Sequence, residues 1–298
     1  MARKKPIAAL IYDFDGTLSP GNMQEFGFIQ AVGKTPDEFW DMSHQVAKGQ
    51  DASQILCYMK LMIDQAKKYG IALKRENFVS FGKNIELFDG VKEWFALINE
   101  YGLQHDVVVE HYINSSGQTE IIEGSPIGKE FKKIFACSYM YNEKGNAVWP
   151  AVAVDYTNKT QFLFKINKGI MSIRDSRKVN ESQPEDEKPV PFTNMIYFGD
   201  GMTDIPCMKI VKMFGGNSIA VYPPAEKAAF AKESRSMLND KRVNFICPAD
   251  YRKDGEIYKV VTAIIDKIKS DSDYAVLQRL NSNRMKKAQS EPSKKKSK

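Results

Sequence analysis

Two carboxylates one residue apart, Asp13 and Asp15, stand at the end of an apolar run over residues 7–12 that predicts a buried parallel strand. Alternation along a strand points both carboxylates to one side, where like charges disfavour joint ionisation. A bound divalent cation removes that conflict, and Gly16 lets the chain leave the strand in a tight turn. The alternative is a surface strand end followed by an ordinary turn. The apolar strand in front and residues 16–18 behind favour a metal-dependent reaction site.

The segment Asp13-Phe14-Asp15-Gly16-Thr17-Leu18 resembles the first motif of the haloacid dehalogenase (HAD) superfamily, most of whose members are magnesium-dependent phosphatases. The resemblance implies three further motifs in a fixed order. They are a strand that ends in Ser or Thr, a Lys at a helix start, and an acidic pair after another buried strand. Each can be sought in the remaining sequence.

The second motif is found in residues 106–117, where apolar residues at 107–109 and 112–113 predict a strand. We expect Ser115 at the carboxyl end of this strand and Ser116 in the turn that follows. A hydroxyl and free backbone N–H groups at that place suit a phosphate oxygen. Taken alone, an ordinary polar turn explains the same residues equally well.

The third motif is found in residues 158–169, which predict a helix. Asn158 can serve as its N-cap and Gly169 as its stop, and the residues between them carry a helical apolar face. Lys159 lies in the first turn, where the helix dipole disfavours a cation unless a bound phosphoryl group offsets it. Lys165, further along the helix, is the alternative. Position in the helix favours Lys159, and a helix without a functional role would leave both lysines solvated.

The fourth motif begins after an apolar run over residues 195–198 that predicts another buried strand. The segment Gly199-Asp200-Gly201-Met202-Thr203-Asp204 follows, with a spacing of acids that is common in the superfamily. We expect Asp200 at the strand end and Asp204 one turn into the next helix. Such hard oxygen ligands are what Mg²⁺ requires. A Gly-Asp-Gly turn without a function is the alternative.

The resemblance implies hydrolysis of a phosphate monoester. Asp13 would attack phosphorus, and Asp15 would donate a proton to the leaving alcohol and then deprotonate water. The Mg²⁺ cofactor would be held by oxygens of Asp13, Asp200, Asp204 and, through its backbone carbonyl, Asp15. The phosphate-binding groups would be those of Ser115, Ser116 and Lys159. A carboxylate at position 15 is typical of the phosphatases and mutases of the superfamily.

The motif spacing and the segment after the first motif resemble the phosphoserine-phosphatase-like group, which carries a small helical cap. Specificity for the amino acid in that group relies on a Glu soon after the first motif and an Arg in the cap. Here Asn22 occupies the neighbourhood of that Glu, Glu25 is the nearest acid, and Arg75 is the only Arg between residues 19 and 88. We therefore expect a small phosphorylated metabolite as partner without assigning phosphoserine. A phosphomutase that uses the same aspartates and a non-catalytic regulator that binds phosphorylated ligands are the alternatives.

The resemblance also implies an α/β fold with a doubly wound parallel-sheet, Rossmann-like core and a small α-helical cap domain. We expect the core over residues 1–18 and 89–277 and the cap over 19–88. The hydrophobic pattern predicts helices over about 35–49, 53–69, 75–83 and 89–102, and further core strands over 134–139 and 218–222. The polar, proline-rich segment 174–192 predicts a loop, either a solvated excursion or a lid.

Composition bounds the remaining properties. The 298 residues are 43% hydrophobic, enough for a sizeable core, and no apolar run is long enough to span a membrane. The net charge is +6, but residues 279–298 carry +7 of it and the remainder carries −1. We expect residues 278–298 to form a disordered basic tail, with nonspecific nucleic-acid contacts as the alternative to a solubilising end. No basic stripe with interleaved aromatics marks the body as a nucleic-acid binder.

The cysteines and histidines show no spacing typical of a metal or redox site. We expect the four cysteines to be buried thiols in a reducing cytoplasm. His44, His105 and His111 are expected to be structural or solvated.

Overall fold

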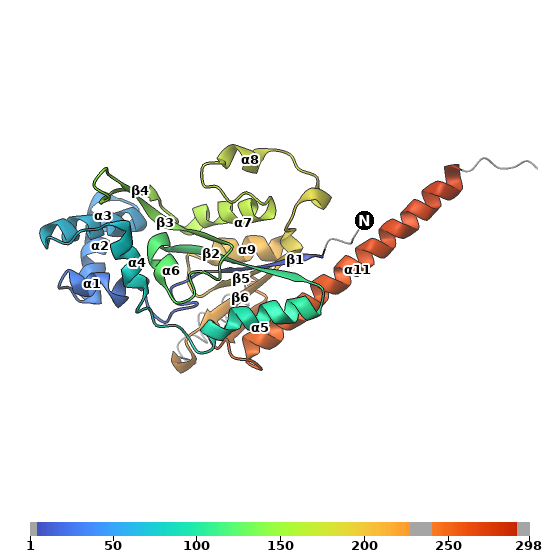
Figure 1. Ribbon diagram of the computed structural model, residues 1–298, viewed down its shortest axis with the longest axis horizontal. Helices are drawn as coiled ribbons and strands as arrows, with labels where there is room; N and C mark the ends of the chain where they lie inside the picture. Colours follow the sequence, from blue (N-terminus) through green and yellow to red (C-terminus); the bar gives the residue numbers. More distant parts are fainter. Residues whose placement is uncertain (1–4, 227–239, 291–298) are drawn as a thin grey trace, which may run out of the picture.

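The computed structural model describes residues 5–226 and 240–290 of the chain. A seven-stranded sheet forms its centre, in the order β4-β3-β2-β1-β5-β6-β7 (Figure 1). The strands are β1 (Ile7–Tyr12), β2 (Val108–Gln118), β3 (Lys133–Tyr141), β4 (Ala147–Val152), β5 (Met195–Gly199), β6 (Asn217–Tyr222) and β7 (Phe245–Pro248). Neighbouring strands are parallel except β3 and β4, which are antiparallel. The mostly parallel sheet confirms the predicted α/β core.

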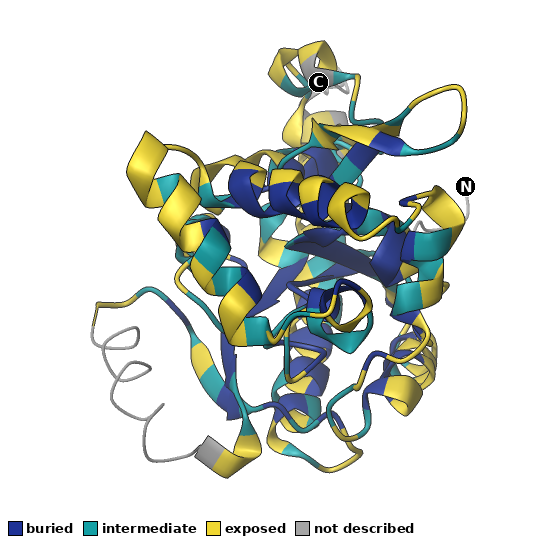
Figure 2. Ribbon diagram, turned by 90° about the vertical axis from the view of Figure 1, so that its left-hand side faces the viewer, coloured by how far each residue is buried: buried dark blue, intermediate teal, exposed yellow. Residues whose placement is uncertain are grey.

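Helices cover both faces of the sheet, as a doubly wound fold requires. In Figure 1, α7 (Thr160–Asn167) and α9 (Ile205–Met213) lie on one side, and α5 (Val91–Gln104) and α11 (Glu256–Ser290) on the other. The strands between them are largely buried (Figure 2). Residues 8–12 of the central strand β1 have no exposed surface, which explains why this strand reads as a continuous apolar run. The remaining short elements of the core are α6 (Thr119–Gly124), α8 (Ser176–Asn180), η2 (Tyr156–Lys159), η3 (Glu185–Glu187), η4 (Phe192–Asn194) and η5 (Pro224–Glu226).

A helical insert between β1 and β2 lies at one end of the sheet (Figure 1). It consists of η1 (Met23–Phe26), α1 (Phe28–Ala31), α2 (Pro36–Gln50), α3 (Gln54–Lys68) and α4 (Arg75–Gly82). A capping box begins α2 as predicted, because Glu38 N–H donates to Thr35 Oγ1 (3.2 Å) and Thr35 N–H to Glu38 Oε2 (2.9 Å). The insert confirms the helical segment expected there, and the domain bounds at residues 18/19 and 88/89 stay a prediction.

The insert is joined to the core by close helix packing. Helix α4 lies against α6, and a Cβ on Gly124 would be 1.9 Å from the carbonyl oxygen of Val79. A Cβ on Gly82 would likewise be 2.1 Å from the carbonyl oxygen of Ile121. These two small residues allow the backbones to touch, so the insert and the core share one hydrophobic cluster.

Two strands are not predicted by the hydrophobic pattern, for physical reasons. Strand β4 is an edge strand with mostly exposed or half-exposed side chains, so it shows no apolar run. Strand β7 has only four residues. The segments η1 and α1 have four residues each, which is too short for a helical period. The predicted loop over 174–192 contains the short helix α8 and the 3₁₀ segment η3, and η4 begins at its last residue.

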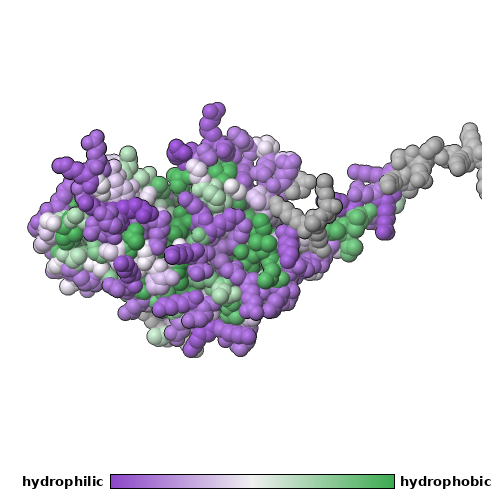
Figure 3. Space-filling view, in the orientation of Figure 1, coloured by the Kyte–Doolittle hydropathy of each residue, from purple (hydrophilic) through white to green (hydrophobic). Residues whose placement is uncertain are grey.

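Helix α11 continues through residues 278–290, where the sequence analysis predicted a disordered tail. Its first half packs on the core through Ile257, Val261, Ile264 and Ile265. The second half extends away from the body, and its surface in Figure 3 is mixed, with hydrophilic and hydrophobic side chains exposed. No Gly or Pro interrupts residues 256–290. Helix propensity therefore continues the helix beyond the part that packs on the core. Residues 291–298 of the predicted tail lie outside the described residues. Within the described ranges, no helix is long and apolar enough to cross a membrane.

A buried hydrogen-bonded chain crosses the core beside β1. Trp94 Nε1 donates to Tyr12 Oη (2.9 Å), Tyr12 Oη lies 3.0 Å from His111 Nδ1, and His111 Nε2 lies 3.2 Å from Asn99 Oδ1. Burial lowers the pKa of His111 from 6.5 to about 3. His111 is therefore a neutral, structural histidine, as predicted.

We expect this histidine to make folding sensitive to acid. The unfolded chain takes up the His111 proton below pH 6.5 and the folded chain only near pH 3, so the contribution of His111 to stability decreases as the pH falls. The difference in free energy of unfolding between wild type and His111→Asn should shrink by about 1.4 kcal/mol per pH unit in that window. Urea unfolding from pH 7.5 downward measures it, with His105→Asn as the control. A pH-independent difference would contradict the assignment.

Candidate active site

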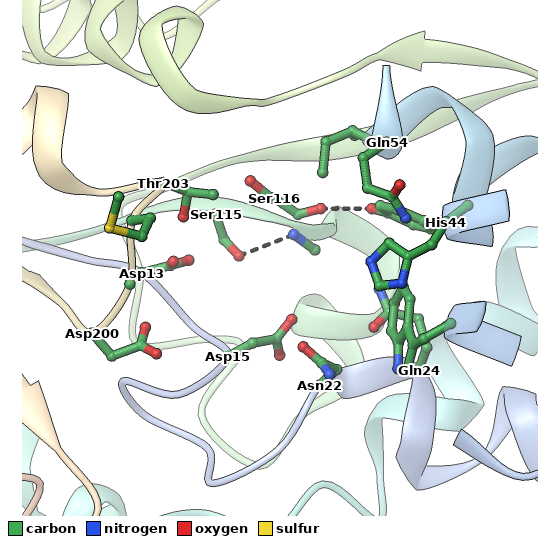
Figure 4. Close-up of a pocket in the computed structure, with 16 residues that line it drawn as sticks. Asp13, Asp15, Asn22, Gln24, His44, Gln54, Ser115, Ser116, Asp200 and Thr203 are labelled. Atoms are coloured by element: carbon green, nitrogen blue, oxygen red, sulfur yellow. Dashed lines mark hydrogen bonds between the residues drawn. The ribbon is translucent and has the colours of Figure 1, made fainter. Parts of the chain in front are cut away.

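A cavity of about 530 Å³ lies at the carboxyl ends of β1, β2 and β5, between the sheet and the insert (Figure 4). This is the edge at which parallel α/β sheets bind their ligands. The residues on its core side are Asp13, Asp15, Ser115, Ser116, Gly117, Asp200, Gly201, Met202 and Thr203. Those on its insert side are Asn22, Gln24, Trp40, His44, Gln54, Ile55 and Tyr58.

Asp13 directly follows the central strand and is held by three contacts. Its backbone N–H donates to the Phe198 carbonyl oxygen (2.9 Å), which extends the pairing of β1 with β5. Its Oδ1 accepts from the Phe14 backbone N–H (2.7 Å), and its Oδ2 accepts from Lys159 Nζ (2.9 Å). The carboxylate is nearly buried and still lines the cavity.

The carboxylates of Asp200 and Asp204 meet that of Asp13. One oxygen from each of the three lies within 4.8 Å of the others. Asp200 follows β5, the neighbour of β1. Asp204 is the N-cap of α9, so the prediction that it lies one turn inside that helix is wrong. Asp204 Oδ1 accepts from Lys159 Nζ (2.7 Å) and from the Tyr197 hydroxyl (2.8 Å). We call Asp13, Asp200 and Asp204 the carboxylate cluster.

A glycine makes room for the cluster. Gly16 has φ +73°, and a Cβ at this position would lie 2.1 Å from Asp200 Oδ2. Any side chain there would displace the carboxylate, in addition to the backbone strain of a positive φ. Thr17 Oγ1, one residue on, donates to Asp200 Oδ1 (3.3 Å).

The carboxylate cluster fits a divalent cation. Asp13 and Asp204 are buried and pair with the Lys159 ammonium, and Asp200 is half-buried beside them. Burial raises the pKa of Asp200 and of Asp204, and the neighbouring carboxylates raise both further. A hard cation with a preference for oxygen ligands would balance this charge, as in the divalent metal sites typical of HAD proteins.

Lys159, and not Lys165, reaches the cluster. Lys159 is completely buried, and although burial lowers its pKa, Asp13 and Asp204 raise it by more, so the ammonium stays charged. Lys165 Nζ instead donates to the carbonyl oxygens of Ser172 (2.9 Å) and Ile173 (3.4 Å). Lys159 ends the 3₁₀ turn η2 immediately before α7, with Asp155 rather than Asn158 as the N-cap of that turn.

Asp15 lies apart from the carboxylate cluster and faces the same cavity. Its Oδ1 accepts from the Met23 backbone N–H (2.9 Å), so the start of the insert fixes its orientation. Burial raises the pKa of Asp15 well above its usual range, and the Asp13 carboxylate adds to this effect. Figure 4 shows its carboxylate between Asp200 and Asn22.

Ser115 and Ser116 both line the cavity, but the strand does not end where the sequence pattern indicated. Strand β2 continues to Gln118, with an irregular pairing to β3 between Asn114 and Gln118. Ser115 Oγ accepts from the Gly117 N–H (3.0 Å), which leaves its hydroxyl hydrogen available. Ser116 Oγ is buried and has no partner within the described part of the chain.

The insert side of the cavity was not predicted. His44, which we expect from the sequence to be structural or solvated, lines the cavity, and so does Trp40. Polar residues Asn22, Gln24 and Gln54 do so as well. Gln54 directly follows the Ser53 cap of α3, and that position is the only sequence signal we find. Which helix faces point toward the sheet depends on contacts far apart in the chain.

The architecture is a HAD-like fold. No family model matches the sequence. A phosphoserine phosphatase bound to its substrate aligns with 88% of this chain and 99% of its own, with a TM-score of 0.50 and 14% identity. A phosphoserine phosphatase with an analogue of its phospho-aspartyl intermediate aligns with 87% of this chain and 99% of its own, with a TM-score of 0.50 and 14% identity. At these identities the likeness establishes the fold alone.

Two further proteins are similar to this chain over a comparable share of its length. A probable phosphoserine phosphatase from Vibrio cholerae aligns with 91% of this chain and 67% of its own, with a TM-score of 0.51 and 13% identity. An uncharacterised Borreliella burgdorferi protein is 27% identical over 285 residues, which cover 87% of this chain and 96% of that protein. The structural neighbours over most of the chain include phosphoserine phosphatases with the HAD fold.

We expect Mg²⁺ to stabilise the folded protein. A cation that binds only the folded state at about 100 times its Kd should raise the midpoint of thermal unfolding by roughly 5 °C. Asp200→Asn removes one ligand charge and should abolish most of this shift. Asp64→Asn, which changes an exposed carboxylate on α3, should retain it. Equal shifts in wild type and Asp200→Asn, measured by differential scanning fluorimetry with and without EDTA, would contradict a metal site in the cluster.

Proposed function

We propose that the protein is a Mg²⁺-dependent phosphatase that hydrolyses the phosphate monoester of a small metabolite through an aspartyl-phosphate at Asp13. The observation that carries this proposal is the carboxylate cluster paired with Lys159, because two of its members, Asp13 and Asp200, line a cavity that Asp15 also lines. Phosphoserine phosphatases with the same fold, bound to substrate or to an analogue of the phospho-aspartyl intermediate, support it. The four cysteines are buried and form no disulfide, which supports a cytoplasmic location.

In the first step, an Asp13 carboxylate oxygen attacks phosphorus and the bond from phosphorus to the alcohol oxygen breaks. Asp15 gives its proton to that oxygen, so a neutral alcohol leaves. In the second step, Asp15 takes a proton from water as the water oxygen attacks phosphorus, and the bond to Asp13 breaks. Inorganic phosphate leaves, and both carboxyl groups return to their starting forms.

The surrounding groups position the phosphoryl group and balance its charge. Mg²⁺, held by Asp13, Asp200 and Asp204, would supply a compact positive charge beside the attacked phosphorus. Lys159 Nζ uses two of its three N–H donors on Asp13 and Asp204, which leaves one for a phosphoryl oxygen. The Ser115 hydroxyl and Ser116 Oγ, which has no partner among the described residues, supply further contacts to the phosphoryl oxygens.

We expect Mg²⁺-dependent phosphate release from p-nitrophenyl phosphate by the wild type, lost in EDTA. Asp13→Asn removes the nucleophile and should lower kcat by at least about 1,000-fold. Rapidly quenched wild type should carry a phosphoryl group in intact-protein mass spectra, and Asp13→Asn should not. Asp64→Asn is the control for loss of a carboxylate. Full turnover by Asp13→Asn would exclude this mechanism.

The two lysines offer a second test. Lys159→Met should lower kcat/KM by about 100-fold or more, because the phosphoryl charge loses its nearest ammonium. Lys165→Met removes hydrogen bonds to two carbonyl oxygens outside the cavity, so activity per folded molecule should stay close to wild type. Circular dichroism of both variants corrects for loss of folded protein. The opposite ranking of the two activities would assign the site to Lys165.

A further inference from the structure

The insert side of the cavity differs in chemistry from the core side. Its polar side chains are the amides of Asn22, Gln24 and Gln54 and the imidazole of His44. Among the described lining residues, no Lys or Arg is present, and the carboxylates all belong to the core side. A pocket that selects a charged alcohol requires an opposite charge, because desolvating an unpaired ion is costly.

The two charged residues of the insert that an amino-acid ester would need are engaged elsewhere. Glu25 does not line the cavity, and its Oε1 accepts from Trp40 Nε1 (2.8 Å) and Asn22 Nδ2 (2.7 Å). Arg75 pairs with Glu123 on α6, outside the cavity lining. Neither is placed to meet the ammonium or carboxylate of an amino acid.

The amides of the insert side retain acceptor oxygens. Gln24 is 2% exposed, its Nε2 donates to Gln118 Oε1 (2.7 Å), and its Oε1 has no partner within the described residues. A buried acceptor left without a donor is unfavourable, and a hydroxyl of a bound ligand would satisfy it. Gln54 Nε2 donates to Ser43 Oγ (2.9 Å) and Asn22 Nδ2 to Glu25, so the amide oxygens of both stay available for donors.

Aromatic surface completes this side of the cavity. The rings of Trp40 and Tyr58 meet edge to face, with centroids 5.8 Å apart, and both line the cavity. The Trp40 indole N–H is held by Glu25 and the Tyr58 hydroxyl donates to the Ser116 carbonyl oxygen (2.6 Å), so both rings are fixed. Fixed aromatic rings beside amide oxygens suit a ligand that has C–H surface and hydroxyl donors together.

We propose that the alcohol part of the substrate is an uncharged polyol or sugar. This proposal is drawn from the insert side of the cavity, which we call the amide wall, and it rests on the proposed phosphatase function. The hydroxyl groups of this alcohol donate to the amide oxygens of Gln24, Gln54 and Asn22, and its carbon skeleton packs on Trp40. An acyclic polyol and a sugar ring share this chemistry. A zwitterionic amino-acid ester, such as phosphoserine, lacks partners for its charges.

The test compares esters that differ in one property. Sorbitol phosphate esterified at a terminal carbon and n-hexyl phosphate have chains of equal length, but only the first carries hydroxyl groups. Glucose phosphate, esterified at its primary hydroxyl, separates a ring from an open chain, and O-phosphoserine introduces charges. We expect kcat/KM with Mg²⁺ to favour a sugar or polyol ester over n-hexyl phosphate and O-phosphoserine by about ten-fold or more.

Variants test whether the amide wall causes the preference for polyol or sugar esters. Gln24→Leu should lower the ratio of kcat/KM for the preferred polyol or sugar ester to kcat/KM for n-hexyl phosphate by about ten-fold, with both esters measured on the same variant. Gln65→Leu is the matched control, because Gln65 is also a buried glutamine whose Oε1 lacks a partner in the described structure, but it lies outside the cavity lining. Gln54→Leu, at a half-buried position, gives the same comparison if Gln24→Leu does not fold.

The outcomes separate the two proposals. Equal turnover of all esters, or preferred turnover of O-phosphoserine or n-hexyl phosphate, overturns the polyol inference and leaves the phosphatase in place. Release from no ester, including p-nitrophenyl phosphate, overturns the phosphatase. In that case calorimetry on wild type decides the inference, since tighter binding of sorbitol or glucose phosphate than of O-phosphoserine supports it and the absence of that preference overturns it.

Discussion

The crowding of three carboxylates beside one buried ammonium is the interaction on which the rest of this structure depends. Asp13, Asp200 and Asp204 are brought together at the end of the central strand, where Lys159 supplies the buried positive charge that pairs with Asp13 and Asp204. Removing such charges from water is unfavourable unless each finds partners. The hydrogen bonds from Phe14, Tyr197 and Thr17 are therefore part of the same arrangement. The remaining negative charge is what makes the cluster suited to a cation.

The sheet supplies the positions for this cluster. Strands β1 and β5 are parallel neighbours, so the residues that follow them, Asp13 and Asp200, meet at one edge. Asp204 and Lys159 come from the start of α9 and the turn before α7, which pack together on one face. The glycine at position 16 allows the chain to turn over Asp200 without displacing it. The site is thus a property of strand order and helix placement combined.

The insert has a structural and a chemical role. It is held to the core by α4 against α6 and by hydrogen bonds from Tyr58 to Ser116 and from Gln24 to Gln118. Its first residues also orient Asp15 through the Met23 backbone. The groups proposed to act on phosphorus come from the core, whereas the amide wall of the cavity comes from the insert. This separation lets the chemistry of the alcohol site vary while the carboxylate cluster stays the same.

Short-range features of the sequence determined much of this protein. The apolar runs before Asp13 and Asp200, the capping box of α2 and the order of the four motifs can be read from short stretches of sequence. A continuous apolar run is typical of a buried parallel strand, and a capping box joins residues three apart. Tertiary structure decided what local patterns leave open. Position at the predicted helix start favours Lys159 over Lys165, and long-range packing places Lys159 against Asp13 and Asp204. The edge strand β4, the extension of β2 past Ser115 and the amide wall of the cavity depend on partners far apart in the chain. Side-chain burial at these positions is set by the fold as a whole and leaves no periodic signal in the sequence.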